Sequence, residues 1–287
     1  MTLLVFGAGG QVGRAVIEQA QARAIGLNEA ACDICDNKAV LRAFEAAPVS
    51  AAVNCAAYTA VDRAETERAR AFAVNSQGAG VIARAAAAHG VPVIHLSTDY
   101  VYAGDQSGPV DEAAPIAPLN VYGASKAAGD AAVMAGNPAH VILRVSWVFG
   151  VHGANFVKTM LRLGSERAEL RIIDDQRGGP TEARDIADAI LTVAVALRAP
   201  GFDAWGVYHF TGAPPTTWFG FAQAIFARTR GPGPKLTPIA TSEYPTPARR
   251  PLNSTLDCSK ILRRFAIAQP DWRVSLSRAM TSLEEKV

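Results

Sequence analysis

The sequence predicts an α/β protein with one doubly wound parallel sheet and a smaller C-terminal lobe. Short apolar segments alternate with helix-like segments over the first half of the 287 residues, a pattern typical of a parallel sheet covered by helices on both faces. A glycine-rich turn directly follows the first apolar segment. Beyond residue 150 the segments become shorter and richer in proline and aromatic residues, which indicates a separate lobe.

The composition is that of an ordinary soluble globular protein, with 49% hydrophobic residues, 19% charged residues and a formal net charge of +2. The arginines are scattered and form no basic stripe, so no nucleic-acid partner is expected. No apolar run is long enough to span a bilayer, and the first residues contain no basic region or cleavage site. Together with the low cysteine content, these features predict a cytoplasmic protein without a membrane contact.

The first expected strand, residues 3–6, runs into a turn that contains Gly7, Gly10 and Gly13, and a helix-like pattern follows through Ala20. Strand, glycine turn and helix in this order are typical of a dinucleotide-binding, Rossmann-type unit. Gly7 allows the tight turn, and Gly10 lets the backbone approach a pyrophosphate at the helix N-terminus. Gly13 permits close packing of the helix on the strand.

A second strand is expected at residues 24–27, where such units normally place an acid for the adenosine ribose of NAD. Asn28 stands at that position, and Glu29 follows it. The missing acid removes a charge that would repel a 2′-phosphate, and Arg14 could reach one. The choice between NADPH and NADH therefore remains open.

The third expected strand, residues 51–55, ends in Ala56 and Ala57, small residues that let the chain pass close to a flat ligand. A long alanine-rich helix follows through Ala88 and contains Asn75. An asparagine there either faces solvent or a water, or takes a role that only the fold can give it.

The fourth expected strand, residues 91–96, carries Ser97, Thr98 and Asp99 to its C-terminal end, where open α/β sheets bind ligands. His95 on this strand is expected to be a core histidine with its hydrogen bonds satisfied. A fifth strand is expected at residues 141–145. These strands complete the alternation that predicts the parallel sheet.

If the segment after Pro118 is helical, Tyr122 and Lys126 lie on one face about a turn apart. A nearby ammonium favours the phenolate, so Tyr122 could exchange a proton closer to neutral pH. The spacing alone is more often that of a surface aromatic residue beside a solvated lysine. Thr98 at a strand end and the glycine turn favour the proton donor.

The second half predicts a strand at residues 170–174 that returns to the main sheet, a tight loop at 177–181 and a helix from about Asp185 to Leu197. We expect residues 1–149 plus 169–213 to form the Rossmann domain. Residues 150–168 plus 214–287 are expected to form the smaller C-terminal substrate-binding lobe. Its core is predicted to include aromatic residues: Trp205, Tyr208, Phe210, Trp218, Phe219 and Phe221.

Several motifs occur together in one order: Gly7-x-x-Gly10-x-x-Gly13, residues 54–65, residues 97–102, Tyr122-x-x-x-Lys126, and the segments 144–149, 155–162 and 244–251. With them the chain resembles an extended short-chain dehydrogenase/reductase. Within that superfamily it is similar to the dTDP-4-dehydrorhamnose reductase family over nearly its whole length. The resemblance implies an NAD(P)H-dependent oxidoreductase acting on CH–OH groups, which reduces dTDP-4-dehydro-β-L-rhamnose to dTDP-L-rhamnose for cell envelope polysaccharide.

The resemblance also implies the catalytic roles. Tyr122 would protonate the carbonyl oxygen of the sugar as hydride arrives at C4. Lys126 would bind the nicotinamide ribose and depress the pKa of the tyrosine. Thr98 would hydrogen-bond the same carbonyl oxygen and polarise it.

Binding residues follow from the same resemblance, with NADPH or NADH as cofactor and a dTDP-sugar as substrate. Asp33 would lie near the adenine, and Asn75 would support the lysine through a water. The implied cofactor-binding residues are Gly7, Gly10, Gln11, Val12, Gly13, Asp33, Ile34, Ala56, Ala57, Tyr58, Asn75, Tyr122 and Lys126. The implied substrate-binding residues are Thr59, Val61, Asp99, Trp147, Asn155 and Arg250. Arg249, Arg250 and Asn253 could meet the diphosphate, or the arginines could be surface residues beside a proline turn.

The chain departs from the family in one respect. Some members are thought to use glutamates at a metal-assisted dimer contact, one of them soon after the third glycine, where this chain has Arg14 and Ala15. We therefore expect no metal requirement, and the resemblance is compatible with a homodimer. Two alternatives stay open: a non-catalytic regulatory binding subunit of the same fold, and a reductase or epimerase for another nucleotide sugar. The presence of Thr98, Tyr122 and Lys126 favours an enzyme.

Overall fold

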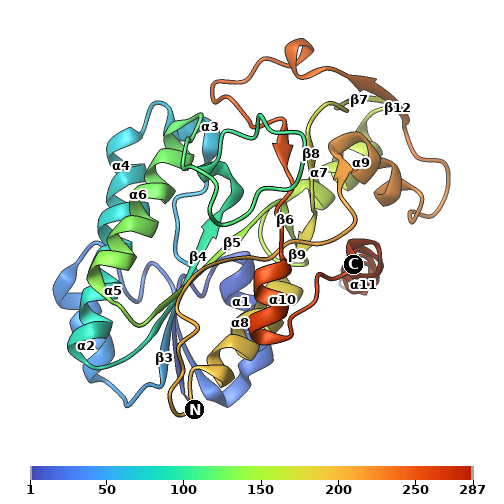
Figure 1. Cartoon of the computed structure of the whole chain (residues 1–287). Helices are drawn as coiled ribbons and strands as arrows, with labels where there is room; N and C mark the ends of the chain where they lie inside the picture. Colours follow the sequence, from blue (N-terminus) through green and yellow to red (C-terminus); the bar gives the residue numbers. More distant parts are fainter. Residues whose placement is uncertain (1, 286–287) are drawn as a thin grey trace.

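A parallel sheet runs through the centre of the molecule (Figure 1). In a computed structural model that describes residues 2–285, this sheet has six strands in the order β10-β5-β4-β3-β1-β2. All neighbouring strands in it are parallel. The chain therefore builds outward in both directions from β1, which confirms the predicted doubly wound fold. The strands are β1 (Leu3–Phe6), β2 (Ala24–Leu27), β3 (Ala51–Asn54), β4 (Val93–Thr98), β5 (His140–Val145) and β10 (Gly206–His209).

Helices cover both faces of the sheet (Figure 1). On one face, side chains such as Val16 and Ile190 pack into a core shared with β1 and β5. On the other face, Phe44, Ile82 and Val133 pack against Leu4 and its neighbours. Because strands β1 and β3 are buried on both faces, they read in the sequence as continuous apolar runs. The first set of helices is α1 (Gln11–Ala20), α8 (Ala183–Ala196) and α10 (Ser259–Phe265), and the second is α2 (Asn37–Glu45), α5 (Ala79–Ala88) and α6 (Val121–Gly136).

The predicted alanine-rich helix contains a π-helical segment, η2 (Ala73–Gly78), between α4 (Arg68–Phe72) and α5. A π-turn accommodates one more residue than an α-turn, and such turns are frequent at functional sites. Asn75 lies in this segment and is buried. The short helix α3 (Val61–Ala64) precedes α4.

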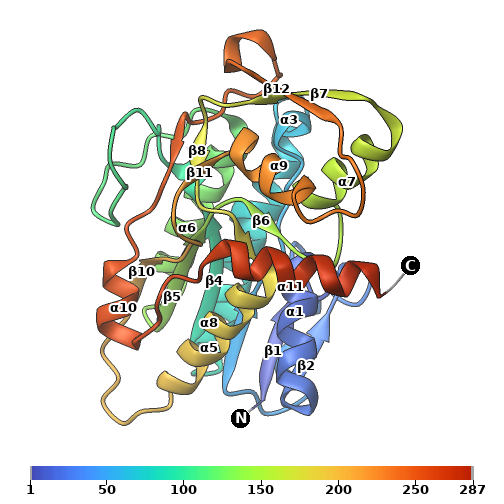
Figure 2. The ribbon, with the colours of Figure 1, turned by 90° about the vertical axis from the view of Figure 1, so that its right-hand side faces the viewer.

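A second core lies between α7 (Phe156–Glu166), α9 (Trp218–Phe226) and α11 (Trp272–Glu284), and it includes Phe149 and Phe221. Figure 2 shows α11 crossing the molecule between this lobe and the helices α1 and α8. Short strand pairs join the lobe to the main domain: β6 (Val148–Phe149) with β9 (Thr181–Glu182), and β8 (Arg177–Gly178) with β11 (Thr216–Thr217) and β13 (Asn253–Ser254). The remaining short 3₁₀ segments are η1 (Gln21–Arg23), η3 (Asp99–Val101) and η4 (Thr241–Glu243).

The expectation that residues 170–174 return to the main sheet is wrong. Strand β7 (Glu169–Ile173) pairs in parallel with β12 (Lys235–Ile239) instead. Leu170 and Ile172 are buried while Glu169 and Arg171 are exposed, and this alternation is typical of a strand with one solvated face rather than of a parallel strand covered on both. Tyr208 and Phe210 also lie in the main-domain core, not in the lobe.

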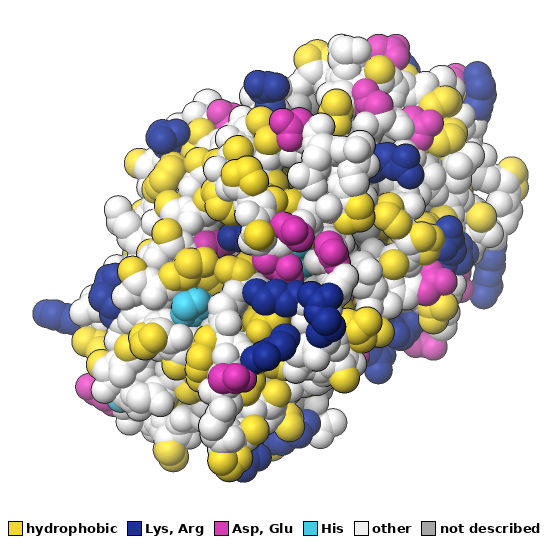
Figure 3. Space-filling model, in the orientation of Figure 1, with side chains coloured by type: hydrophobic (Ala, Val, Ile, Leu, Met, Phe, Trp, Pro, Cys, Tyr) yellow, Lys and Arg dark blue, Asp and Glu magenta, His cyan; other side chains and the backbone are white. Residues whose placement is uncertain are grey.

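The division into residues 1–149 plus 169–213 and residues 150–168 plus 214–287 stays a prediction. In the part of the chain that the structure describes, no helix is long and apolar enough to cross a membrane. On the face drawn in Figure 3, basic side chains lie beside acidic ones and do not form a field of one sign.

Candidate active site

In the glycine turn, the backbone at Gly7 lies close both to Ala56, after β3, and to Gly13, in the first turn of α1. Gly7 has a φ of +77°, and a Cβ there would lie 2.4 Å from the backbone nitrogen of Ala56. A Cβ at Gly13 would lie 2.2 Å from the carbonyl oxygen of Gly7. Gly10 precedes α1 and provides no side-chain cap, so the first N–H groups of this helix are available to a phosphate. These residues therefore fit a dinucleotide cofactor.

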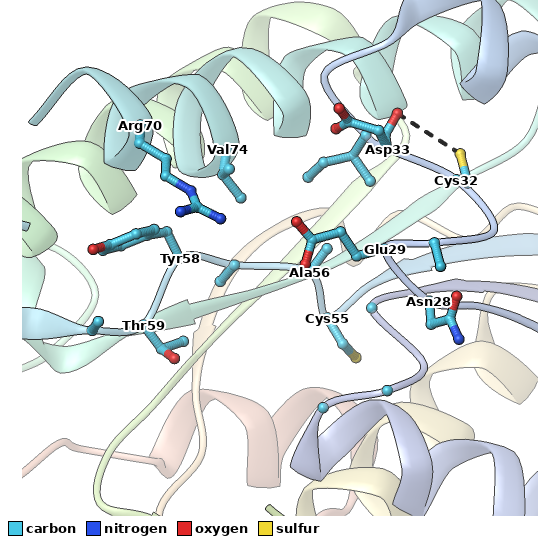
Figure 4. Close-up of a pocket in the computed structure, with 17 residues that line it drawn as sticks. Asn28, Glu29, Cys32, Asp33, Cys55, Ala56, Tyr58, Thr59, Arg70 and Val74 are labelled. Atoms are coloured by element: carbon cyan, nitrogen blue, oxygen red, sulfur yellow. Dashed lines mark hydrogen bonds between the residues drawn. The ribbon is translucent and has the colours of Figure 1, made fainter. Parts of the chain in front are cut away.

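A cavity of about 780 Å³ lies beside this turn. Figure 4 shows Glu29 and Arg70 extending into it from opposite sides. The carboxylate of Asp33 accepts a hydrogen bond from the backbone N–H of Cys35 at 2.9 Å, which orders this part of the wall. The predicted residues among those that line the cavity are Gly7, Gly10, Asp33, Ile34, Ala56, Ala57, Tyr58 and Thr59. Gln11, Val12 and Gly13 form the first turn of α1 next to it.

The residues that bear on cofactor preference are held by local hydrogen bonds. The side chain of Asn28 accepts from the backbone N–H of Ala31 at 2.9 Å and so closes the turn after β2. The Arg14 side chain donates from Nε to the carbonyl oxygen of Gly9 at 3.1 Å. Arg14 therefore lies along the glycine turn, and its reach to a 2′-phosphate stays a prediction.

Lys126 is buried on the second turn of α6, with 2% of its surface exposed. Its Nζ donates to the carbonyl oxygen of Leu96 at 2.8 Å and lies 3.5 Å from Nε2 of His95. Burial lowers the pKa of the ammonium to about 8, and the carboxylate of Asp130 opposes this shift. The helix thus directs a cationic group to the C-terminal half of β4.

Tyr122 begins the same helix face one turn earlier and is half-buried. Desolvation raises the pKa of its hydroxyl above the ordinary value; the side chain of Thr98 opposes this shift, and the charges of Asp99 and Asp130 add to it. Lys126 is not among the groups that affect this pKa here, and its ammonium is directed to Leu96, so the depression of the pKa of Tyr122 by Lys126 stays a prediction. A raised pKa keeps the phenol protonated, as a proton donor requires.

Thr98 and Asp99 lie together at the end of β4. The hydroxyl of Thr98 donates to Oδ1 of Asp99 at 2.9 Å. Asp99 is 3% exposed, and its burial raises the pKa of the carboxyl to about 6, although Ser254 and Thr98 oppose the shift. The carboxyl group is therefore poised to change its protonation state close to neutral pH.

Asn75 joins the chain after β3 to the helix that carries Tyr122. Its Oδ1 accepts from the backbone N–H of Tyr58 at 2.8 Å, and its Nδ2 donates to the carbonyl oxygen of Tyr58 at 3.0 Å and to Oγ of Ser125 at 2.9 Å. The interpretation that it faces solvent is wrong, since only 1% of it is exposed. Support of Lys126 through a water stays a prediction.

The model of the family described as "RmlD substrate binding domain" matches residues 1–285. A dTDP-4-dehydrorhamnose reductase from Sinorhizobium fredii is 43% identical over 289 residues, which cover 99% of this chain and 98% of that protein. The chain belongs to the dTDP-4-dehydrorhamnose reductase family.

Solved structures of this family have the same fold. A dTDP-4-dehydrorhamnose reductase from Clostridium acetobutylicum superposes with a TM-score of 0.93 at 34% identity, covering 99% of this chain and 100% of that one. A dTDP-4-dehydrorhamnose reductase from Bacillus anthracis, in complex with NADP, gives 0.91 at 33% identity and covers 98% of this chain and 100% of that one. The predicted family and its fold are thereby confirmed.

Within this reductase fold, Trp147 stacks on Trp218 of the lobe. The ring centroids are 3.6 Å apart and the planes differ by 7°. Trp147 has a φ of +48°, and a Cβ at Gly178 would lie 2.5 Å from its indole ring. Trp218, predicted only as lobe core, therefore covers one face of the residue expected to contact the sugar.

Asn155 caps α7 and links the lobe to the glycine turn. Its Oδ1 accepts from the backbone N–H of Lys158 at 3.2 Å, and its Nδ2 donates to Oε1 of Gln11 at 3.1 Å and to the carbonyl oxygen of Gly150 at 2.8 Å. These bonds engage the whole carboxamide. A contact between Asn155 and the sugar stays a prediction.

Arg250 pairs with Asp62 near the start of α3, where the predicted residue Val61 is located. The guanidinium donates from its two terminal nitrogens to the two carboxylate oxygens at 3.0 and 2.8 Å, and this hydrogen bonding lowers the pKa of Asp62. Arg249 is exposed, whereas Asn253 donates to two backbone carbonyl oxygens. The fold therefore places Arg250 and Asn253 in structural contacts.

A buried polar cluster behind Lys126 had no signal in the sequence beyond the expectation of a core histidine at position 95. Arg144 pairs with Asp130 at 2.9 Å, and His95 lies 3.0 Å from the side-chain nitrogen of Asn54. Burial holds the pKa of His95 well below its ordinary value. These partners come from β3, β4, β5 and α6, so no spacing along the chain could reveal them.

Proposed function

We propose that this chain reduces dTDP-4-dehydro-β-L-rhamnose to dTDP-L-rhamnose with NADPH or NADH. The observation that carries the proposal is the position of three side chains at one sheet edge. Thr98 ends β4, Tyr122 interacts with it from α6, and Lys126 contacts the carbonyl oxygen of Leu96 on the same strand. Cys55 and the residues after it follow the neighbouring strand β3 and line the cavity beside the glycine turn, whereas these three side chains are not among its lining residues.

Each of these side chains has a distinct task. Tyr122 donates the proton of its hydroxyl to the carbonyl oxygen at C4 of the sugar, and its raised pKa keeps that proton in place beforehand. Thr98 hydrogen-bonds the same oxygen and stabilises the negative charge that develops on it. When bound, NADPH or NADH supplies the hydride.

Support for the cofactor site comes from the backbone. The turn at Gly7 and Gly13 would be filled by any Cβ, and the uncapped start of α1 can receive the pyrophosphate. Ala56, Ala57 and Asp33 line the cavity next to this turn, and Asp33 would lie near the adenine. Lys126 would hold the nicotinamide ribose through its ammonium.

The proposal is tested by supplying the purified chain with the 4-keto dTDP sugar and either reduced nucleotide. We expect loss of the reduced nicotinamide absorbance and formation of dTDP-L-rhamnose in equal amounts. Sugar binding without cofactor consumption would favour the regulatory binding subunit. Turnover only with another nucleotide sugar would favour a related reductase, and isomerisation without net cofactor use would favour an epimerase.

Activity is expected to be independent of added metal. The expectation rests on Arg14 and Ala15, which follow Gly13 where some members of the family carry a glutamate. Assays in EDTA, with and without later addition of Mg²⁺, measure this directly. A loss of activity in EDTA that Mg²⁺ restores would contradict the expectation.

We further propose that the reaction takes place in the cytoplasm and that the chain forms a homodimer. The free thiols of Cys32, Cys35, Cys55 and Cys258 support a reducing compartment. Size-exclusion chromatography with light scattering measures the assembly state.

A further inference from the structure

The side chain of Asn120 joins two segments that are far apart in the sequence. Its Oδ1 accepts from the backbone N–H of Gly123 at 2.7 Å and so caps α6. Its Nδ2 donates to the carbonyl oxygen of Arg249 at 2.7 Å. Arg249 belongs to the segment 244–251, which we call the strap. One carboxamide, 8% exposed, therefore holds both the start of α6 and the strap.

The start of α6 carries Tyr122 as its second residue, so its placement sets the position of the phenol. The backbone N–H of Val121 donates to Oε1 of Glu65 at 2.9 Å. A Cβ at Gly123 would lie 2.1 Å from the carbonyl oxygen of Tyr100, so the first turn is packed tightly on that residue. The ring of Tyr100 lies edge-on to that of Tyr122, with centroids 5.5 Å apart.

The strap has two further anchors near the same place. Asp62 accepts from the backbone N–H of Ala248 at 3.2 Å and pairs with Arg250. A Cβ at Gly104 would lie 2.4 Å from Pro251, so the end of the strap packs on the chain that follows β4. Burial raises the pKa of Tyr100, and the positive charge of Arg250 opposes this shift. The strap therefore contacts the surroundings of Tyr122 on several sides.

A helix cap alone does not require asparagine at position 120. Serine, threonine or aspartate would supply the acceptor for the N–H of Gly123 equally well. The carboxamide adds a donor at a fixed distance from that acceptor, and this donor is what reaches the carbonyl oxygen of Arg249. The choice of asparagine is thus explained by the second bond.

We propose that Asn120 is a positioning residue that couples the seating of the strap to the placement of Tyr122. The proposal rests on the proposed function for the identity of the substrate. The link between Asn120 and the strap does not depend on the proposed function, because it is a hydrogen bond within the chain. When the strap seats on Asn120 and Asp62, the first turn of α6 is held in the position from which the phenol reaches the sugar.

Asn120→Ser separates the two roles, since serine keeps the cap and is too short to reach Arg249. We expect kcat/KM for the sugar nucleotide to fall about tenfold, the effect of losing a contact of about 1.4 kcal/mol. The Kd for NADPH should change less than about twofold, and the melting temperature should hardly move. Asp271→Ser is the matched control, because Asp271 caps α11 through the N–H of Arg273 at 2.9 Å, outside the strap.

Hydrogen exchange measured without any sugar tests the link independently of substrate identity. In Asn120→Ser, peptides that cover residues 244–251 should exchange faster, while those that cover the start of α6 keep their protection. Asn120→Asp keeps the acceptor and lacks the donor, so we expect the same faster exchange in it. It replaces the serine variant if that variant folds poorly. Asp62→Asn should also speed hydrogen exchange in the peptides that cover residues 244–251. In the double variant, its effect on kcat/KM should not add fully to that of Asn120→Ser.

Unchanged exchange in the strap would overturn the proposal, whatever the activity of the variant, and Asn120 would then be a helix cap only. Faster strap exchange with unchanged kcat/KM would equally overturn it, since the strap would then have no influence on Tyr122. If the wild-type chain does not reduce the 4-keto sugar, the proposed function fails. The exchange result still decides whether Asn120 holds the strap.

Discussion

Replacing Tyr122 by phenylalanine is expected to lower kcat for sugar reduction about 10²- to 10⁴-fold, the usual contribution of a positioned general acid. The substitution removes the proton and keeps the ring, including its edge-on contact with Tyr100. The Kd for NADPH should therefore stay close to that of the wild type. Steady-state kinetics and a fluorescence titration with NADPH measure the two quantities separately.

Tyr208→Phe is the matched control for this variant. It removes a buried hydroxyl that donates to the carbonyl oxygen of Ala204 at 2.8 Å, on an edge strand away from Thr98 and Lys126. We expect some loss of thermal stability and full activity. Wild-type turnover in Tyr122→Phe would show that another group supplies the proton.

Replacing Lys126 by methionine is expected to impair both cofactor binding and turnover. Methionine retains most of the buried volume but removes the ammonium that donates to Leu96. A charged hydrogen-bond donor contributes about 1.5–3 kcal/mol, so the Kd for NADPH should rise roughly 10- to 100-fold. Lys260→Met is the control, because Lys260 makes a similar contact, from Nζ to the carbonyl oxygen of Val207 at 2.7 Å, outside the proposed site. A wild-type Kd in Lys126→Met would contradict a role in holding the cofactor.

The pH dependence of the same titration gives a second readout for Lys126. Its pKa is lowered to about 8, so the ammonium is present below that pH and is lost as the pH rises through it. Affinity for NADPH should accordingly weaken above about pH 8 in the wild type. Lys126→Met has no proton to lose, and its affinity should be nearly flat over this range.

The parallel sheet and the glycine turn could be predicted because their signals are local. Strands such as β1 and β3, buried on both faces, read as unbroken apolar runs. Gly13 is required by a close contact with the carbonyl oxygen of Gly7 in the same turn, and the positive φ of Gly7 is a local property of that turn. Tyr122 and Lys126 share a helix, so their common face follows from the helical period alone.

The remaining features depend on contacts between distant residues. Asp62 and Arg250 are separated by 188 positions, and Gln11 and Asn155 by 144. No spacing could show that these side chains engage one another instead of remaining free for a ligand. The raised pKa of Tyr122 likewise depends on how the fold desolvates its hydroxyl, which the distance to Lys126 along the chain does not reveal.

The stacked indoles of Trp147 and Trp218 give the protein an internal optical reporter. The two rings are nearly parallel at 3.6 Å, close enough for their electronic transitions to couple. One ring follows β5 and the other begins α9, so the near-ultraviolet circular dichroism of the pair depends on how the lobe is seated on the main domain. The stacking of the two rings can therefore be followed in the unlabelled protein, with and without cofactor and substrate.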